Sequence, residues 1–169
     1  MVPRFGNGRS YAPTTLKDFE MYPEASTAVS HARSAGFLTI VITNQPDVGS
    51  GIVAKSVVEE MHCILRSELK VDDVEVCYEA SGGVGRRRKP NPGMILDAAE
   101  RWNISLERSF VIGDRASDIQ AAQRAGCRSI FIDRGYSSEP KPEGFNFKAV
   151  DAVDAVAWCV AQGGAQQDA

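Results

Sequence analysis

The sequence predicts an α/β fold, a Rossmann-like three-layer sandwich with a mainly parallel sheet. Short apolar runs suited to strands alternate along the chain with segments of helical periodicity. Such alternation favours right-handed crossovers and helices on both faces of the sheet. A chain of 169 residues, 43% hydrophobic and 24% charged, is ordinary for one globular domain. We therefore expect a single domain over residues 1–162 and a flexible tail at 163–169.

The expected elements follow in chain order. Residues 1–23 are rich in Gly, Pro, Ser and Thr and show no pattern of a buried strand, so we expect an irregular segment. Apolar runs predict strands at 37–42, 74–78, 110–112 and 129–132. Helical patterns and their end signals predict helices at 24–35, 54–69, 92–102, 117–125 and 150–160. A polar connection is expected at 133–148.

Composition excludes several classes of protein. The net charge of 19 − 22 = −3 gives no field that would attract nucleic acid or an anionic membrane. The four cysteines have no CxxC spacing, which favours reduced, buried thiols over disulfides. There is neither an apolar run of membrane-spanning length nor an apolar secretory core at the start. We expect a cytoplasmic protein, a monomer or weak oligomer, that binds a small molecule.

Polar residues follow two of the expected strands. Thr43, Asn44 and Gln45 come after the run at 37–42, and Asp114 comes after the run at 110–112. Ligands of open α/β sheets bind beyond the carboxyl ends of the strands. A Thr hydroxyl can donate to a phosphoryl oxygen, although a strand-end Thr alone is more often a turn former. These positions favour a phosphate site at that edge.

A dense basic cluster, Arg86 to Lys89, precedes Pro90. It could be a solvated charge run or a patch for nucleic acid. The second reading fits poorly, because the chain is acidic and no aromatic residues lie among the cations. Lys89, fixed by the neighbouring proline, is the residue we expect to neutralise a developing phosphoryl charge.

Two aspartates, Asp114 and Asp118, stand four residues apart at a helix start. Mg²⁺ prefers carboxylate, water and phosphate oxygens, so a strand-end aspartate suits it. Both acids could instead cap the helix. We favour Asp114 as the metal ligand, with Asp118 in a supporting role.

In order, these motifs are an apolar strand ending Thr-Asn-Gln, then Arg-Lys-Pro-x-Pro-Gly-Met (88–94), then Val-Ile-Gly-Asp-x-x-x-Asp (111–118). This order resembles the haloacid-dehalogenase-like (HAD) phosphatases, in particular the heptose-bisphosphate and histidinol-phosphate branch, which has little or no cap domain. The similarity extends from about Tyr11 through Gly135.

The resemblance implies a phosphoaspartyl mechanism with Mg²⁺, in which one Asp attacks phosphorus and a second, two residues later, acts as acid and base. Thr43 and Lys89 would be catalytic. The implied substrate is a small phosphorylated metabolite, most plausibly a sugar such as D-glycero-D-manno-heptose 1,7-bisphosphate. The implied substrate-binding residues are Thr43, Asn44, Gln45, Arg88, Lys89 and Arg115.

The chain departs from this pattern at its start. The family places Asp-x-Asp-Gly after the first central strand, but no aspartate precedes Asp18 here, and Asp18 matches a later position. We expect the central strand and the nucleophile to be absent, so that the chain as printed is inactive. A start site placed too late is the simplest account, and a true loss is the other. The alternative function is a non-catalytic phosphate-binding or partner-binding protein; a receiver-like domain fits less well.

A second departure concerns zinc. Many relatives in this branch carry a Cys/His loop with four zinc ligands, whereas here Cys77 stands alone and Glu79 occupies the place of a His. We expect no structural zinc and a mobile loop over 79–88.

Overall fold

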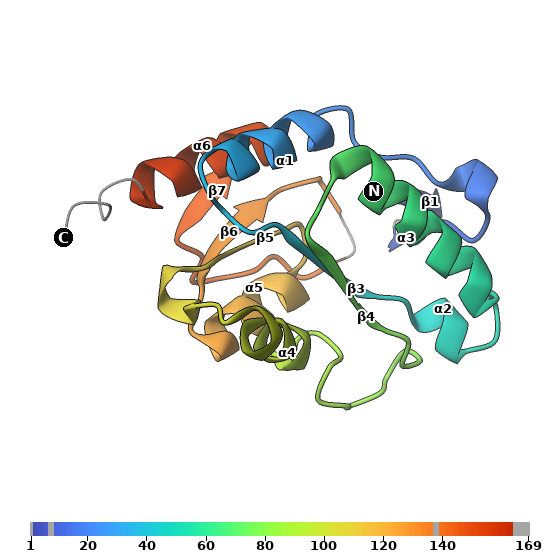
Figure 1. Ribbon diagram of the computed structural model, residues 1–169. Coiled ribbons are helices and arrows are strands. Elements are labelled where there is room, and N and C mark those ends of the chain that lie inside the picture. Colours follow the sequence, from blue (N-terminus) through green and yellow to red (C-terminus); the bar gives the residue numbers. More distant parts are fainter. Residues whose placement is uncertain (1, 7–8, 137–138, 164–169) are drawn as a thin grey trace.

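The computed structural model describes residues 2–6, 9–136 and 139–163. Its parallel strands form two separate sheets (Figure 1). One pairs β3 (Ile40–Asn44) with β4 (Asp73–Cys77), and Ile42 lies opposite Glu75. The other has the order β5 (Phe110–Gly113), β6 (Arg128–Ile132) and β7 (Phe147–Ala149). A short antiparallel pair, β1 (Arg4–Gly6) and β2 (Arg9–Tyr11), lies near the N-terminus.

Helices cover both faces of these sheets. In Figure 1, α1 (Ala25–Ser34) and α6 (Ala152–Gly163) run together along the top, and α4 (Gly93–Trp102) and α5 (Ala116–Ala125) lie together at the bottom. The long helix α3 (Lys55–Leu69) contacts β4 and α1. Short helical turns complete the description: η1 (Leu16–Asp18), α2 (Pro46–Gly49) and η2 (Leu106–Arg108).

Apolar contacts connect the two sheets through the lower helices. The core cluster of α4 and α5 contains Ile95 and Ala122, and it packs against Ile42 of β3 and Val111 of β5. A second cluster joins β6 to α6 around Ile130, which is fully buried. The α4–α5 layer therefore packs against both β3 and β5.

The predicted fold class is confirmed, and several details of the elements are corrected. Residues 4–6 and 9–11 form strands where an irregular segment was expected. Within the expected polar connection, Phe147–Ala149 is a strand that pairs with β6. The strand expected at 37–42 begins at Ile40 and continues to Asn44. Most of the expected tail, residues 164–169, lies outside the described residues.

A cleft separates the two parallel sheets. Among the described residues, β3 pairs only with β4, and β5 pairs only with β6. The facing edges of β3 and β5 line one open cavity of about 1670 Å³. Although β3 was expected to be buried on both faces, its five residues are only half-buried, and Ile112 of β5 is 37% exposed. The position expected to lack a central strand is therefore an open space at the middle of the fold.

The four cysteines are free, and three of them, Cys77, Cys127 and Cys159, are buried. Burial raises the pKa of the Cys127 thiol to about 11 and that of the Cys159 thiol to about 12. These thiols therefore stay protonated at neutral pH and pack as small apolar groups. Over the described residues, no helix combines the length and the apolarity needed to cross a bilayer.

Candidate active site

The structure gathers the predicted site residues at one end of the cleft. The cavity is lined by Thr43, Asn44, Arg88, Lys89, Asp114, Arg115 and Asp118. Three separate segments supply them: the end of β3, the loop before α4, and the turn from β5 into α5. Gln45 is the exception, because it is 4% exposed and lies outside the cavity wall.

Lys89 is bound to both sides of the cleft. Its Nζ lies 2.7 Å from Oδ1 of Asp118 and donates a 3.0 Å hydrogen bond to the carbonyl of Ile42. The Lys89 and Asp118 side chains are 12% and 9% exposed. The other oxygen of Asp118 accepts from the Arg115 amide at 3.1 Å, at the start of α5. Asp118 is thus committed to Lys89 and to the helix cap, which leaves Asp114 as the metal candidate of this pair.

Asn44 and Gln45 make hydrogen bonds that position neighbouring site residues. The Asn44 amide clamps the Lys89 backbone, donating to its carbonyl and accepting from its N–H, both at 3.1 Å. Gln45 donates to the Thr43 hydroxyl oxygen at 3.1 Å. Because a hydroxyl both donates and accepts, the Thr43 proton remains available to a ligand. No sequence pattern predicted that Gln45 is buried, so its position outside the cavity wall was not expected.

Asp114 receives a hydrogen bond from a residue that sequence reasoning missed. The Tyr136 hydroxyl donates to Oδ2 of Asp114 at 2.6 Å, and Tyr136 is 6% exposed. Burial raises the pKa of Tyr136, and the hydrogen bond to Asp114 raises it further. Tyr136 lies in the polar segment after β6, where one aromatic residue among turn residues was the only sequence signal.

Mg²⁺ fits this arrangement only in part. Mg²⁺ is usually held by one or two carboxylates together with waters and substrate phosphate. Asp114 can supply one carboxylate. In the part of the chain that the structure describes, no three His, Cys, Asp or Glu side chains form a group that could hold a metal ion. Asp114 would therefore hold the ion together with phosphate and water.

Further charged residues surround this end of the cleft. Arg115 pairs with Glu139 at 3.3 Å and lies over the Tyr136 ring. Asp47, on α2 just past β3, also lines the cavity and was not singled out from the sequence. Its place just after the end of an apolar strand was the available sequence signal.

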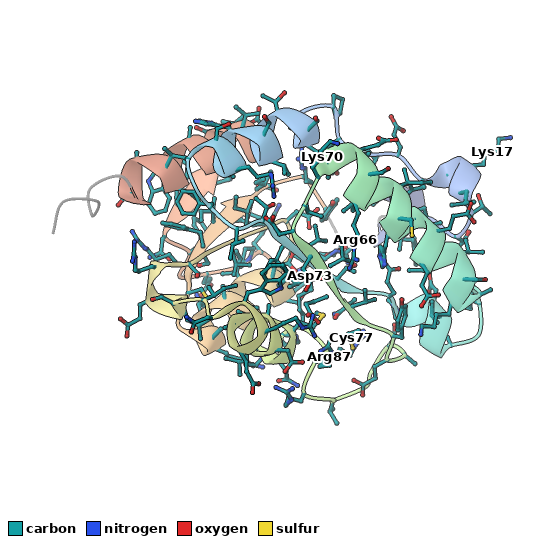
Figure 2. The ribbon with its side chains drawn as sticks, viewed as in Figure 1. Lys17, Arg66, Lys70, Asp73, Cys77 and Arg87 are labelled. Atoms are coloured by element: carbon teal, nitrogen blue, oxygen red, sulfur yellow. The ribbon has the colours of Figure 1, made fainter. Side chains whose placement is uncertain are left out.

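The basic cluster divides into two structural arginines and two residues that line the cavity. Arg87 lies in the loop after β4, near Cys77 in Figure 2, and pairs with Glu75 at 2.5 Å and with Asp97. Arg86 also pairs with Asp97. Glu75 is 3% exposed and also binds Arg101. These pairs attach the loop to β4 and α4, so Arg86 and Arg87 are structural, while Arg88 and Lys89 line the cavity.

Glu79 organises the loop that was expected to be mobile. Its two carboxylate oxygens accept from the Gly85 amide at 2.9 and 3.0 Å. A Cβ at Gly83 or Gly85 would lie 2.4 or 2.2 Å from that carboxylate, so the Glu79 side chain would have to move. The Glu79 carbonyl in turn accepts from Arg88 at 2.8 Å. The carboxylate closes the loop on itself, and these contacts do not support a mobile loop.

A pH prediction follows from Asp133, at the end of β6. Its hydrogen bond from Lys141, with others from the Gly135 amide and Lys148, lowers its pKa from 3.8 to about 2. The unfolded chain therefore binds a proton more readily than the folded one. The stabilisation is present above about pH 4 and is lost as pH falls toward 2. Melting temperatures measured from pH 6 to 2 should fall less steeply for Asp133→Asn than for the parent chain; parallel curves would contradict this.

Comparison with known proteins identifies the family. A family model described as HAD-hydrolase-like matches residues 86–159. The D-glycero-β-D-manno-heptose-1,7-bisphosphate 7-phosphatase of Rhodopseudomonas palustris is 38% identical over 124 residues, which make up 66% of this chain and 69% of the relative. The chain belongs to the heptose-bisphosphate phosphatase family of HAD-like hydrolases.

Other members of the heptose-bisphosphate phosphatase family are similar over comparable lengths. The D-glycero-α-D-manno-heptose-1,7-bisphosphate 7-phosphatase of Photorhabdus laumondii is 30% identical over 74% of this chain and 76% of the relative. The crystal structure of a D,D-heptose 1,7-bisphosphate phosphatase from B. bronchiseptica, complexed with magnesium and phosphate, superposes with a TM-score of 0.81. That match covers 95% of this chain and 93% of the other at 22% identity, which supports the shared fold.

Proposed function

We propose that this chain carries the phosphate site of a Mg²⁺-dependent phosphomonoesterase that acts on a sugar phosphate such as D-glycero-D-manno-heptose 1,7-bisphosphate. The supporting observation is that Thr43, Lys89 and Asp114 meet at one end of a single cleft. The relatives named heptose-1,7-bisphosphate 7-phosphatase support this choice of substrate.

Each of these residues has a distinct task in the proposed site. The Thr43 hydroxyl donates to a phosphoryl oxygen, and Gln45 orients it. The Lys89 ammonium offsets the charge that develops on the phosphoryl group, and the Asn44 clamp and Asp118 fix its position. Asp114 would hold Mg²⁺, which supplies further positive charge to the phosphate when bound.

We further propose that the chain as printed binds this substrate without turning it over. Of the acidic residues in the cavity wall, Asp114 is bound to Tyr136, Asp118 to Lys89, and Glu139 to Arg115. The fourth, Asp47, lies on α2 beyond the strand ends. We infer that none of the four attacks phosphorus, because three of them are already bound to other side chains and Asp47 is on a separate short helix.

Binding tests the proposed phosphate site. Calorimetric titration with heptose 1,7-bisphosphate in Mg²⁺ should give saturable binding, whereas the unphosphorylated heptose should not bind. Thr43→Val should weaken binding about tenfold to a hundredfold, because a hydrogen bond to a charged group contributes roughly 1.5–3 kcal/mol. Thr43→Ser, which keeps the hydroxyl, is the matched control and should bind like the parent chain.

Two outcomes would overturn the assignment. One is equal binding of the phosphorylated and unphosphorylated sugars, since the site would then not recognise phosphate. The other is equal weakening by Thr43→Val and Thr43→Ser, since the hydroxyl would then have no role. Histidinol phosphate, titrated in parallel, separates a sugar phosphate site from one for the other substrate of this branch.

A further inference from the structure

Tyr136 is a buried side chain in direct contact with the carboxylate of Asp114. Its hydroxyl donates to Oδ2 of Asp114 at 2.6 Å, and the residue is 6% exposed. Both residues line the cavity. A hydrogen bond to an ionised acceptor is about twice as strong as one between neutral groups, so this contact can fix the orientation of the carboxylate.

The turn that precedes Tyr136 is closed by its own hydrogen bonds. Gly135 has a φ of 75°, a conformation that glycine adopts more readily than residues with a Cβ. Its amide donates to Oδ1 of Asp133 at 3.0 Å, and Asp133 also binds Lys141 at 2.5 Å and Lys148 at 3.2 Å. The backbone directly ahead of Tyr136 is therefore held in one conformation.

Arg115 holds the face of the Tyr136 ring. Its guanidinium lies 5.5 Å from the ring centroid, within the range of an attractive cation–π contact. Arg115 also pairs with Glu139 at 3.3 Å, and its backbone amide donates to Asp118 at 3.1 Å. Since Arg115 follows Asp114 in the chain, the ring and the hydroxyl of Tyr136 contact two consecutive residues of the turn from β5 into α5.

The two oxygens of the Asp114 carboxylate consequently differ. Oδ2 accepts from Tyr136, whereas Oδ1 makes no hydrogen bond within residues 2–6, 9–136 and 139–163. Mg²⁺ demands a near-octahedral arrangement and keeps several waters, while Ca²⁺ also accepts both oxygens of one carboxylate. A carboxylate with one oxygen already occupied suits Mg²⁺ better than Ca²⁺.

We propose that Tyr136 is a positioning residue that holds Asp114 with one oxygen left for Mg²⁺. This inference rests on the proposed function, in which Asp114 holds the ion. Hydrogen bonds to metal ligands orient them, and losing one typically lowers metal affinity about tenfold to a hundredfold. Tyr136 thereby raises the affinity for Mg²⁺ and favours it over Ca²⁺.

Metal titrations of the full chain test this role. Apparent dissociation constants come from the rise of Tm along a Mg²⁺ or Ca²⁺ series in phosphate-free buffer at constant ionic strength. Tyr136→Phe should weaken Mg²⁺ binding about tenfold to a hundredfold and Ca²⁺ binding less. The matched control is Tyr78→Phe, which removes a phenol from a half-buried residue outside the cavity wall and should leave both affinities unchanged.

A calorimetric titration with inorganic phosphate in metal-free buffer separates Asp114 from the rest of the site. Tyr136→Phe should bind phosphate like the parent chain, because Thr43 and Lys89 are untouched. Equal weakening of phosphate and Mg²⁺ binding would show a general disturbance of the cleft and would overturn the proposal. Equal weakening of Mg²⁺ and Ca²⁺ binding would also overturn it, since the carboxylate would then not be selective.

Asp114→Asn distinguishes failure of this inference from failure of the proposed function. If Asp114→Asn abolishes Mg²⁺ binding and Tyr136→Phe leaves it unchanged, the metal ligand stands and Tyr136 has no positioning role. If Asp114→Asn binds Mg²⁺ like the parent chain, Asp114 is not the metal ligand, and the role of Tyr136 fails with it.

Discussion

Replacing Lys89 with methionine is expected to destabilise the protein by about 3–5 kcal/mol, the usual cost of leaving a buried charge without its partner. The charge left behind is the Asp118 carboxylate, whose ion pair with Lys89 spans 2.7 Å between two largely buried side chains. The bond from Lys89 to the Ile42 carbonyl is lost as well. Urea unfolding monitored by circular dichroism measures the change.

Two further variants separate the ion pair from a general effect of losing a lysine. Lys89→Met combined with Asp118→Asn should recover much of the loss, because no unpaired charge remains. Lys17→Met should change stability by no more than about 0.5 kcal/mol, since Lys17 is exposed and points away from the protein in Figure 2. If Lys89→Met were as mild as Lys17→Met, the buried pair would have no stabilising role.

The contacts of Lys89 extend the role expected from sequence. From sequence, the lysine was expected to bind substrate and to neutralise a developing phosphoryl charge. The structure adds a second task, because the same ammonium connects β3 to the start of α5. A loss of activity on Lys89→Ala therefore has to be read together with the unfolding free energy.

Arg87→Ala should cost about 2–4 kcal/mol, whereas Arg86→Ala should cost about 1 kcal/mol or less. Arg87 binds the buried Glu75, Asp97 and the Val76 carbonyl. Arg86 makes one pair with Asp97, and its side chain is 64% exposed. Arg101 still pairs with Glu75 in the Arg87 variant, which moderates the loss. Urea unfolding of both variants gives the comparison.

The two neighbouring arginines control for each other, because both substitutions remove one positive charge from the same loop. Equal and small losses of unfolding free energy would show that the loop is a solvated charge run, which is one of the alternatives that the sequence left open. A larger loss for Arg87 supports its role as the anchor between β4 and α4.

The apolar runs predicted strands β3 to β6, because the apolar residues of such a strand are consecutive in the sequence. Ile130 and its neighbours in β6, for example, need no distant information to be recognised. β7 was missed because three residues, Phe147 to Ala149, with a lysine at the centre, give no periodicity. The pairing of β7 with β6 depends on the fold and not on its own sequence.

Candidate site residues could be singled out from sequence where they belong to a local motif, whereas contacts between distant segments could not. Thr43, Lys89 and Asp114 were found from local motifs, and they line one cavity. The contacts of Asn44 with Lys89, 45 residues away, and of Tyr136 with Asp114, 22 residues away, have no local signal. The expected gap at the central strand has become a cleft with two defined edges.

Phosphate release tests the central claim most directly. The 169-residue chain is incubated with heptose 1,7-bisphosphate and Mg²⁺, and inorganic phosphate is measured against a buffer control. We predict no release above that control, because we propose that none of the carboxylates lining the cavity attacks phosphorus. Sustained release that disappears on Asp114→Asn would contradict it, and loss on Asp47→Asn as well would identify Asp47 as the attacking group.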